Sequence, residues 1–299
     1  MRELVWFFVH LRWHYQIFIL SGGFLLGALF QPRLDFGSLT IQFLSVHLLL
    51  NGGLTAYNSF YDEDEGPVGG LESPPPMRPW MLPASLGVQL VGAGVASLEG
   101  PVFLALYGLT MGLSVLYSAP RFRWKGHPLL SLVAVGVGTG TNTFLMGYLS
   151  AGSLGLNPTV LIAALGVSAI LLSLYPVSQV FQIEEDRARG DLTFAARYGL
   201  AGVRRFFLAC YLLGLPLTVA LLWTVRPWAA LGLLLAGGLG GIASHLTLGR
   251  LRGAPDEYRI VMRLKLGASL SFVAFLVACL VGVGLAAGQV ASAVNVSTP

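Results

Sequence analysis

Two stretches of the sequence place polar side chains at helical spacing and end in carboxylates. The first advances in steps of four, four, three and four residues, through His47, Asn51, Thr55, Asn58 and Asp62. Residues three or four positions apart share one face of an α-helix. We therefore expect these side chains to form a single polar stripe with a carboxylate at its end.

The second stretch repeats this pattern in the other half of the chain. It advances in steps of four, three and four residues, through Tyr175, Gln179, Gln182 and Asp186. Further acids surround both ends, since five of the 14 acidic residues lie within 62–72 and four lie within 184–191. The match between the two stretches indicates an internal duplication.

The two acidic ends have a common chemical use if they face one cavity. Carboxylate and amide oxygens suit Mg²⁺, which in proteins also binds substrate phosphates. The segment between the stripes supplies Arg121, Arg123 and Lys125, whose cations suit phosphate oxygens. Metal and cations beside an apolar bundle suit a ligand with a diphosphate head and a long apolar tail, such as an isoprenoid diphosphate.

The elements that position these residues are expected to be transmembrane helices. Of the 299 residues, 55% are hydrophobic and 11% are charged, and the 38 glycines bring the apolar share to about two thirds. A soluble domain has about 45–50% apolar and about 25% charged residues. This composition excludes a soluble enzyme, a disordered chain and a nucleic-acid-binding module, because too little polar surface is available to face water.

Nine apolar runs approach the length of about 20 residues that crosses a bilayer. They are 16–31, 41–60, 82–99, 101–118, 129–151, 158–181, 204–225, 228–248 and 266–288. The sequence therefore predicts an all-α, polytopic membrane protein with nine transmembrane helices around a central cavity. Residues 1–289 are expected to form one domain, and residues 290–299 a flexible C-terminal tail.

The basic residues predict how these helices are oriented. With a cytoplasmic N-terminus, 16 of the 18 Lys and Arg residues lie on the cytoplasmic side, and only Arg33 and Arg226 lie outside. This asymmetry follows the positive-inside rule and predicts a multi-pass protein of the cell membrane with both acidic ends in the cytoplasm. The same rule could explain the basic segment, and the acids could neutralise loop arginines, but the two acidic stripes together with the basic segment favour a site.

Three spaced motifs combine these residues. The first is Asn58-x-x-x-Asp62, followed by Arg78-Pro79; the second joins Tyr117-Ser118 to Pro120, Arg121 and Lys125; the third is Glu185-Asp186-Arg187, followed by Gly190, Thr193 and Gly199. In these motifs, which spread over nearly the whole chain, the protein resembles the UbiA-type intramembrane prenyltransferases. That resemblance implies nine transmembrane helices and two Asp-rich cytoplasmic motifs, on helices 2 and 6.

The resemblance also implies an activity and a set of roles. The implied reaction transfers a prenyl group from a polyprenyl diphosphate to a lipid-soluble acceptor, commonly an aromatic ring of the quinone-precursor type, within the lipid bilayer. The implied Mg²⁺ ligands are Asn58, Asp62, Asp64, Glu65, Gln182, Glu185 and Asp186. The implied diphosphate-binding residues are Arg78, Arg121, Arg123 and Lys125. The implied catalytic residues are Asp62, Asp186 and Asn58, with Tyr117 and Tyr175 as candidates to face an allylic cation.

Two positions depart from the family motifs. Gly66 stands where the first motif has a final Asp, and Gln182 stands where the second motif begins with Asp. Neighbouring acids that could substitute are Asp64, Glu65, Glu184 and Glu185. These departures keep a second hypothesis open, a non-catalytic binder or carrier of an isoprenoid lipid with the same fold. A secondary transporter is a weaker hypothesis, because paired acidic motifs favour metal–diphosphate chemistry over a proton relay.

Overall fold

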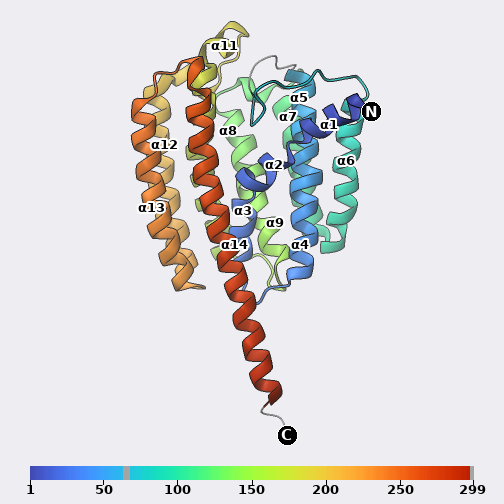
Figure 1. The fold of residues 1–299 in the computed structure, drawn as a ribbon, viewed down its shortest axis with the longest axis vertical. Helices are drawn as coiled ribbons and strands as arrows, with labels where there is room; N and C mark the ends of the chain where they lie inside the picture. The colour runs from blue at the N-terminus through green and yellow to red at the C-terminus, as the bar shows by residue number, and fades with distance from the viewer. Residues whose placement is uncertain (63–67, 297–299) are drawn as a thin grey trace.

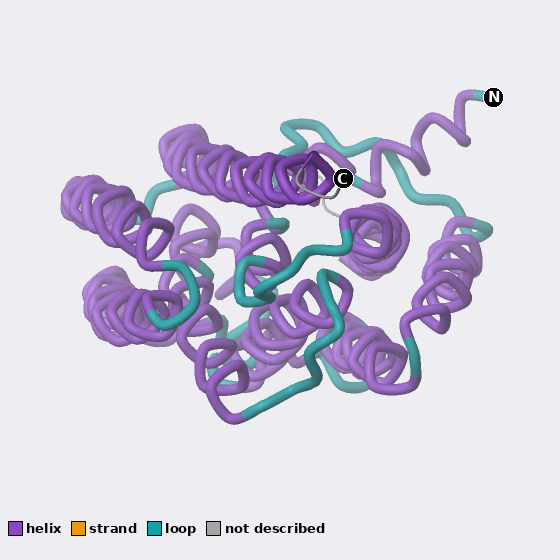
Figure 2. Tube along the Cα trace, turned by 90° about the horizontal axis from the view of Figure 1, so that it is seen from below, coloured by secondary structure: helices purple, strands orange, loops and turns teal. Residues whose placement is uncertain are grey.

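The structure, a computed structural model, describes residues 1–62 and 68–296, with the backbone alone for 288–296. These residues fold into helices and loops, apart from a single bridge between Val68 and Leu71. Most helices run side by side along one direction, and the N-terminus lies at the end of the bundle opposite to the C-terminus (Figure 1, Figure 2). The predicted all-α class is confirmed.

Eight helical segments of the described chain are long and apolar enough to cross a membrane. Their elements are α4 (Phe36–Leu44), η2 (Ser45–Asn51) and α5 (Gly52–Asp62); α6 (Met81–Ala96) and η3 (Ser97–Glu99); α7 (Pro101–Ser118); α8 (Leu130–Ala134), η5 (Val135–Asn142) and α9 (Thr143–Ser150); α10 (Pro158–Leu174), η6 (Pro176–Gln182) and α11 (Ile183–Ala188); α12 (Phe194–Trp223); α13 (Pro227–Arg250); and η7 (Pro255–Glu257) with α14 (Tyr258–Val296). Each segment overlaps one of the apolar runs predicted from residue 41 onwards.

The first predicted crossing, residues 16–31, has a different form. It contains η1 (Gln16–Leu20) and α3 (Gly22–Ala28), separated by a turn at Ser21, and α2 (Trp13–Tyr15) directly precedes it. No single piece reaches the length that crosses a bilayer, so the predicted count of nine is not confirmed. At the other end of the chain, α14 projects beyond the rest of the bundle (Figure 1) and includes the predicted tail as far as Val296. The flexibility of that tail stays a prediction.

Local sequence signals explain where several helices begin. Asp35 caps α4, because its Oδ1 accepts hydrogen bonds from the backbone N–H groups of the first turn at 2.9 and 3.0 Å. Asn157 caps α10 in the same way, and Pro158 follows it at the first helical position, where a missing N–H costs nothing. Thr193 caps α12 through its hydroxyl oxygen. The caps at Asp35 and Asn157 fix the starts of the two spans that carry the polar stripes.

Glycines allow two of the inner helices to touch backbone to backbone. A Cβ atom added at Gly27 of α3 would overlap the carbonyl oxygen of Phe144 on α9, and one added at Gly147 of α9 would overlap that of Phe24 on α3. In lipid the hydrophobic effect does not drive helices together, so small residues at such crossings stabilise the contact by allowing close packing. The α3–α9 contact therefore holds the broken first segment inside the bundle.

Turns that are not α-helical surround the centre of the bundle. The π-helices η1, η2 and η5 and the 3₁₀-helix η6 each contribute residues to the wall of one cavity. A π-helical turn is wider than an α-helical turn and often marks a functional site, because it changes the direction of the side chains. The fold thus provides a cavity with an irregular wall inside an otherwise regular bundle.

The glycine contact can be tested by a matched pair of substitutions. Gly147→Ala is expected to lower the free energy of unfolding by about 1–3 kcal/mol, because the added methyl overlaps backbone that cannot move away. Gly94→Ala makes the same chemical change in α6, where nothing lies within 4 Å of the added Cβ, and is expected to raise stability by up to about 1 kcal/mol. Unfolding of the purified protein by titration with sodium dodecyl sulfate measures both. Equal stability of the two variants would refute the packing argument.

Candidate functional site

A cavity of about 410 Å³ lies between the two polar stripes. Asn51, Thr55 and Asn58 line it from the first stripe, and Tyr175 and Gln182 line it from the second. The remainder of the wall is largely apolar. The structure therefore brings side chains from the two halves of the chain to one site, as their helical spacing predicts.

Four residues of the stripes do not line this cavity: the terminal carboxylates Asp62 and Asp186, described below, and His47 and Gln179. His47 is fully buried between aromatic rings, with its ring stacked on Phe43 at 4.3 Å and its Nδ1 within 2.9 Å of the Phe43 carbonyl oxygen. It lies within the π-helix η2, where a step of four residues no longer keeps side chains on one face. Gln179 instead accepts a hydrogen bond at 3.2 Å from the backbone N–H of Ala195, so it joins η6 to α12.

The first acidic motif is tied to the basic segment. Asn58 Nδ2 donates to Asp62 Oδ2 at 2.7 Å, and Asn58 Oδ1 accepts a hydrogen bond from the Ser118 hydroxyl at 2.9 Å. The ammonium of Lys125 forms an ion pair with Asp62. These contacts hold the end of α5 against the end of α7 and place a cation beside the carboxylate.

The second acidic motif is oriented by the loop that follows it. Thr193 donates a hydrogen bond at 2.7 Å to Asp186 Oδ2, which orients that carboxylate at the end of α11. Burial lowers the pKa of Lys125 to about 8, the negative charges of Asp191 and Asp186 raise it, and Arg189 lowers it. Because that value lies above 7, the ammonium is mostly charged at neutral pH and neutralises Asp62, with which it is paired.

Arg123 joins the basic segment to the loop after the second motif. Its Nε and an Nη atom donate to the two carboxylate oxygens of Asp191 at 2.9 and 2.8 Å, a two-point pair with high geometric specificity. The backbone N–H of Leu192 donates to the Gly126 carbonyl oxygen at 2.9 Å beside this pair. Arg123 itself has a φ of 41°, in the left-handed region, which turns the chain before η4 (Trp124–Gly126). This pair of Arg123 and Asp191, here called the clasp, fixes the position of the loop that carries Lys125.

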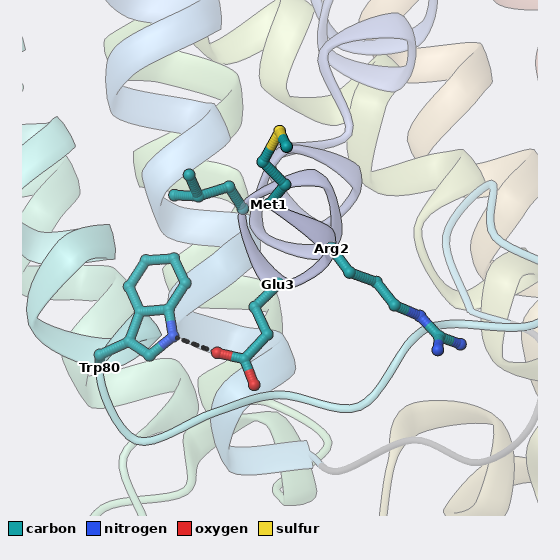
Figure 3. Close-up of a pocket in the computed structure, with 5 residues that line it drawn as sticks. Met1, Arg2, Glu3 and Trp80 are labelled. Atoms are coloured by element: carbon teal, nitrogen blue, oxygen red, sulfur yellow. Dashed lines mark hydrogen bonds between the residues drawn. The ribbon is translucent and has the colours of Figure 1, made fainter.

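The remaining predicted cations lie away from the cavity wall. Arg78 pairs with Glu3 at 3.0 Å, and its guanidinium lies 5.7 Å from the centre of the Trp6 ring, so it is bound to α1 (Arg2–Leu11). Trp80 Nε1 donates to the same Glu3 at 3.2 Å in a surface hollow of about 430 Å³ (Figure 3). Arg121 is exposed in the loop after α7.

The two predicted tyrosines meet in the cavity. The hydroxyl groups of Tyr117 and Tyr175 lie 3.0 Å apart, and both residues line the wall. One comes from each half of the chain: Tyr117 is the penultimate residue of α7, and Tyr175 directly follows α10, seven residues before Gln182. Their rings are therefore available to a ligand in the cavity.

The described donor set suits Mg²⁺ without completing a site. Asp64 and Glu65 lie outside the described residues, and Glu185 is exposed and pairs with Arg189. No three Asp, Glu, His or Cys side chains of residues 1–62 and 68–296 are grouped closely enough to hold a metal ion. The candidate oxygens are those of Asn58 and Gln182, which line the cavity, and those of Asp62 and Asp186, which follow them by four residues. We call the polar end of the cavity at Asn58 and Gln182 the mouth. Protein-bound Mg²⁺ commonly uses one or two carboxylates and takes its other ligands from water and substrate phosphate, so the chemistry fits.

One charged residue of the cavity wall was missed by the sequence analysis. Lys265 of α14 lines the cavity and donates a hydrogen bond at 3.0 Å to the Tyr15 hydroxyl. The two residues are 250 positions apart, and neither belongs to a spaced motif. Asp191 also had no predicted role, although it belongs to the acidic cluster of 184–191.

Comparison with known proteins gives a match over most of the chain. The sequence model of the UbiA prenyltransferase family matches residues 17–266. Two curated relatives from Humulus lupulus are named 2-acylphloroglucinol 4-prenyltransferase, one of them chloroplastic, and each is 28% identical over 131 residues. That match covers 42% of this chain and 31% of the relative. The chain thus spans about a third of the length of the curated relatives it matches.

Solved structures show a similar fold over nearly the whole chain. A UbiA homolog from Archaeoglobus fulgidus bound to DMAPP and Mg²⁺ has a TM-score of 0.67 at 16% identity, covering 91% of this chain and 98% of that one. A UbiA homolog from Aeropyrum pernix K1 in its apo form has a TM-score of 0.62 at 20% identity, covering 90% and 99%. At these identities the likeness establishes the fold.

The clasp between Arg123 and Asp191 gives a testable expectation. Asp191→Asn should destabilise residues 119–129 locally by about 1–3 kcal/mol, because a half-buried arginine loses its two-point partner. Glu185→Gln also removes an ion pair, but that pair is largely exposed and joins neighbouring turns of one helix, so its loss should matter little. Hydrogen exchange of the loop, measured by mass spectrometry, distinguishes the two. Equal exchange in both variants would show that the clasp does not order the loop.

Proposed function

Since the chain belongs to the UbiA prenyltransferase family, we propose that it transfers a prenyl group from a polyprenyl diphosphate to a lipid-soluble aromatic acceptor. The observation that carries this proposal is that the basic segment pairs with the first acidic motif through Lys125 and with the loop after the second motif through Arg123, while Asn58 and Gln182 of the two motifs line one largely apolar cavity. A diphosphate would occupy the polar mouth and its hydrocarbon chain the apolar interior. The mouth is proposed to face the cytoplasm from the cell membrane.

At the mouth, the chain's own residues would bind and neutralise the diphosphate. Lys125 is proposed to contact it, together with the exposed Arg121 of the same loop. Asn58, Asp62, Gln182 and Asp186 would hold Mg²⁺, which when bound neutralises the negative charge of the leaving diphosphate. The ion pairs of Arg78 with Glu3 and of Arg123 with Asp191 support a different role for these two arginines, the positioning of the loops around the mouth.

Inside the cavity, the apolar wall would exclude water from the reacting carbon. The allylic C–O bond breaks with its electron pair leaving on the diphosphate, the acceptor forms a new bond to the allylic carbon, and the acceptor loses a proton. The ring faces of Tyr117 and Tyr175 would stabilise positive charge at that carbon through their quadrupoles. The dry surroundings strengthen this attraction and keep water from capturing the cation.

The comparisons support this class of reaction. The solved homologs from Archaeoglobus fulgidus include complexes with DMAPP and Mg²⁺ and with GPP and Mg²⁺. The relatives from Humulus lupulus are named as prenyltransferases of an acylphloroglucinol, which is an aromatic acceptor. Both observations favour a metal-assisted transfer to an aromatic ring in this chain as well.

The proposed reaction requires both motif carboxylates. Asp62→Ala and Asp186→Ala should each lower transfer from radiolabelled geranyl diphosphate to phenolic acceptors at least about 100-fold. Each substitution removes a proposed ligand of the Mg²⁺ that would stabilise the negative charge of the leaving diphosphate. Chelation of Mg²⁺ with EDTA should have a similar effect. Asp256→Ala is the matched control, since this carboxylate is exposed and pairs with Arg252. Transfer that survives both motif substitutions would exclude the mechanism.

A non-catalytic carrier of an isoprenoid lipid is the second candidate function. The presence of Gln182 in the cavity wall favours it, because the family motif has a charged Asp at this position. We expect Gln182→Asp to lower the Mg²⁺ concentration for half-maximal binding of geranyl diphosphate about tenfold, since a carboxylate binds this ion more tightly than an amide. Equilibrium dialysis at varied Mg²⁺ measures the shift, and an unchanged requirement would place Gln182 outside the metal site. Binding without release of diphosphate in the wild type would favour the carrier over the enzyme.

A further inference from the structure

Deeper in the cavity, two amide side chains have unpaired polar atoms. Gln16 is fully buried and Asn51 is 6% exposed, yet both belong to the cavity wall. Gln16 Oε1 and Asn51 Nδ2 have no hydrogen-bond partner among the described residues. Buried polar atoms are almost always paired, because an unpaired one forfeits its hydration without compensation. These two residues, here called the amide pair, therefore need an explanation.

Thr55 links the Gln16 side chain to the Asn51 backbone. Gln16 Nε2 donates to the Thr55 hydroxyl oxygen at 3.2 Å, and that hydroxyl lies 3.1 Å from the backbone carbonyl oxygen of Asn51. Gln16 begins the π-helix η1, and Asn51 ends the π-helix η2. The two wide turns thus present one free acceptor and one free donor from facing elements.

The position of the pair separates it from the diphosphate end of the cavity. Asn51 precedes Asn58 by seven residues, which corresponds to about 10 Å along a helix. Between the two lies wall that is mostly apolar, including Leu54. A group bound by the amide pair would therefore belong to a molecule in the interior of the cavity, away from the charged head of a prenyl diphosphate.

A hydroxyl group has the chemistry that both free atoms lack in a partner. It can donate to Gln16 Oε1 and accept from Asn51 Nδ2. A carboxylate only accepts, and it would meet the Gln16 oxygen with a repulsive contact. The pair thus favours a neutral hydroxyl over an acid.

We propose that the amide pair is the binding site for a hydroxyl group of the acceptor, so that the acceptor is a hydroxylated apolar molecule. The role of the bound molecule as acceptor rests on the proposed prenyl transfer, but the site itself is defined by the unpaired atoms of Gln16 and Asn51. The hydroxyl could belong to a phenol or to an aliphatic alcohol, which share this chemistry.

Binding of small probes to the full-length protein in lipid nanodiscs tests the assignment. Calorimetric titration compares 1-naphthol with 1-methoxynaphthalene, which has the same rings but no hydroxyl hydrogen, and empty nanodiscs correct for partition into lipid. The wild type should bind 1-naphthol at least about tenfold more tightly, because a site built for a hydroxyl rejects the analogue that lacks its hydrogen. A parallel titration with 1-decanol distinguishes a phenol from an aliphatic alcohol as the source.

Near-isosteric substitutions show whether the amide pair causes that preference. Gln16→Met and Asn51→Leu should each reduce it to about threefold or less. Ser114→Ala is the matched control, because this hydroxyl also lines the cavity but donates at 2.9 Å to the Met111 carbonyl oxygen. Absence of a preference in the wild type, or its survival in both amide variants, would overturn the assignment.

Thermal stability gives a second readout. Because Asn51 Nδ2 contributes no hydrogen bond in the ligand-free protein, Asn51→Leu should leave the melting temperature unchanged or raise it, whereas Gln16→Met also removes the bond from Gln16 Nε2 to Thr55 and should lower it by about two degrees at most. A fall of several degrees in both variants would show that the amides are structural and would overturn the assignment. If the hydroxyl preference is found but no acceptor is prenylated, the site stands and the proposed function fails.

Discussion

The arrangement of the mouth depends on the neutralisation of like charges next to an apolar interior. Asp62 and Asp186 come from helices in different halves of the chain, and burial at one opening would make them repel each other strongly. The ammonium of Lys125 pairs with Asp62, and Arg123 of the same loop pairs with Asp191 just after the second motif, so one basic segment supplies cations to both acidic regions. These pairs hold the loop after α7 to the end of α5 and to the loop after α11.

Much of this architecture could be predicted from the sequence, because in lipid the length of an apolar run and the spacing of its polar residues determine a helix and its face. The stripe from Asn51 to Asn58 and the positions of Tyr175 and Gln182 followed that rule. It failed at His47, since the π-helical turn of η2 changes the residue period and no composition signal marks such a turn.

Contacts that depend on folding of the loops were not predictable. Hydropathy along 16–31 is continuous, so the break at Ser21 between η1 and α3 leaves no trace in the pattern. The family resemblance assigns Arg78 and Arg123 to the diphosphate together with Lys125, but their actual partners, Glu3 and Asp191, are set by how the loops cross. The pair of Lys265 with Tyr15 joins the two ends of the chain and depends wholly on tertiary packing.

The projection of α14 beyond the bundle has a practical consequence for work on the protein. The helix α1 and the C-terminal part of α14 lie at opposite ends of the bundle (Figure 1), and α1 is tied to the start of α6 through Arg78 and Trp80. An affinity tag joined to Met1 would lie next to these contacts, whereas one joined beyond α14 would be far from them. With the mouth facing the cytoplasm, as proposed, that second tag would lie on the external side of the membrane, where intact cells can be labelled.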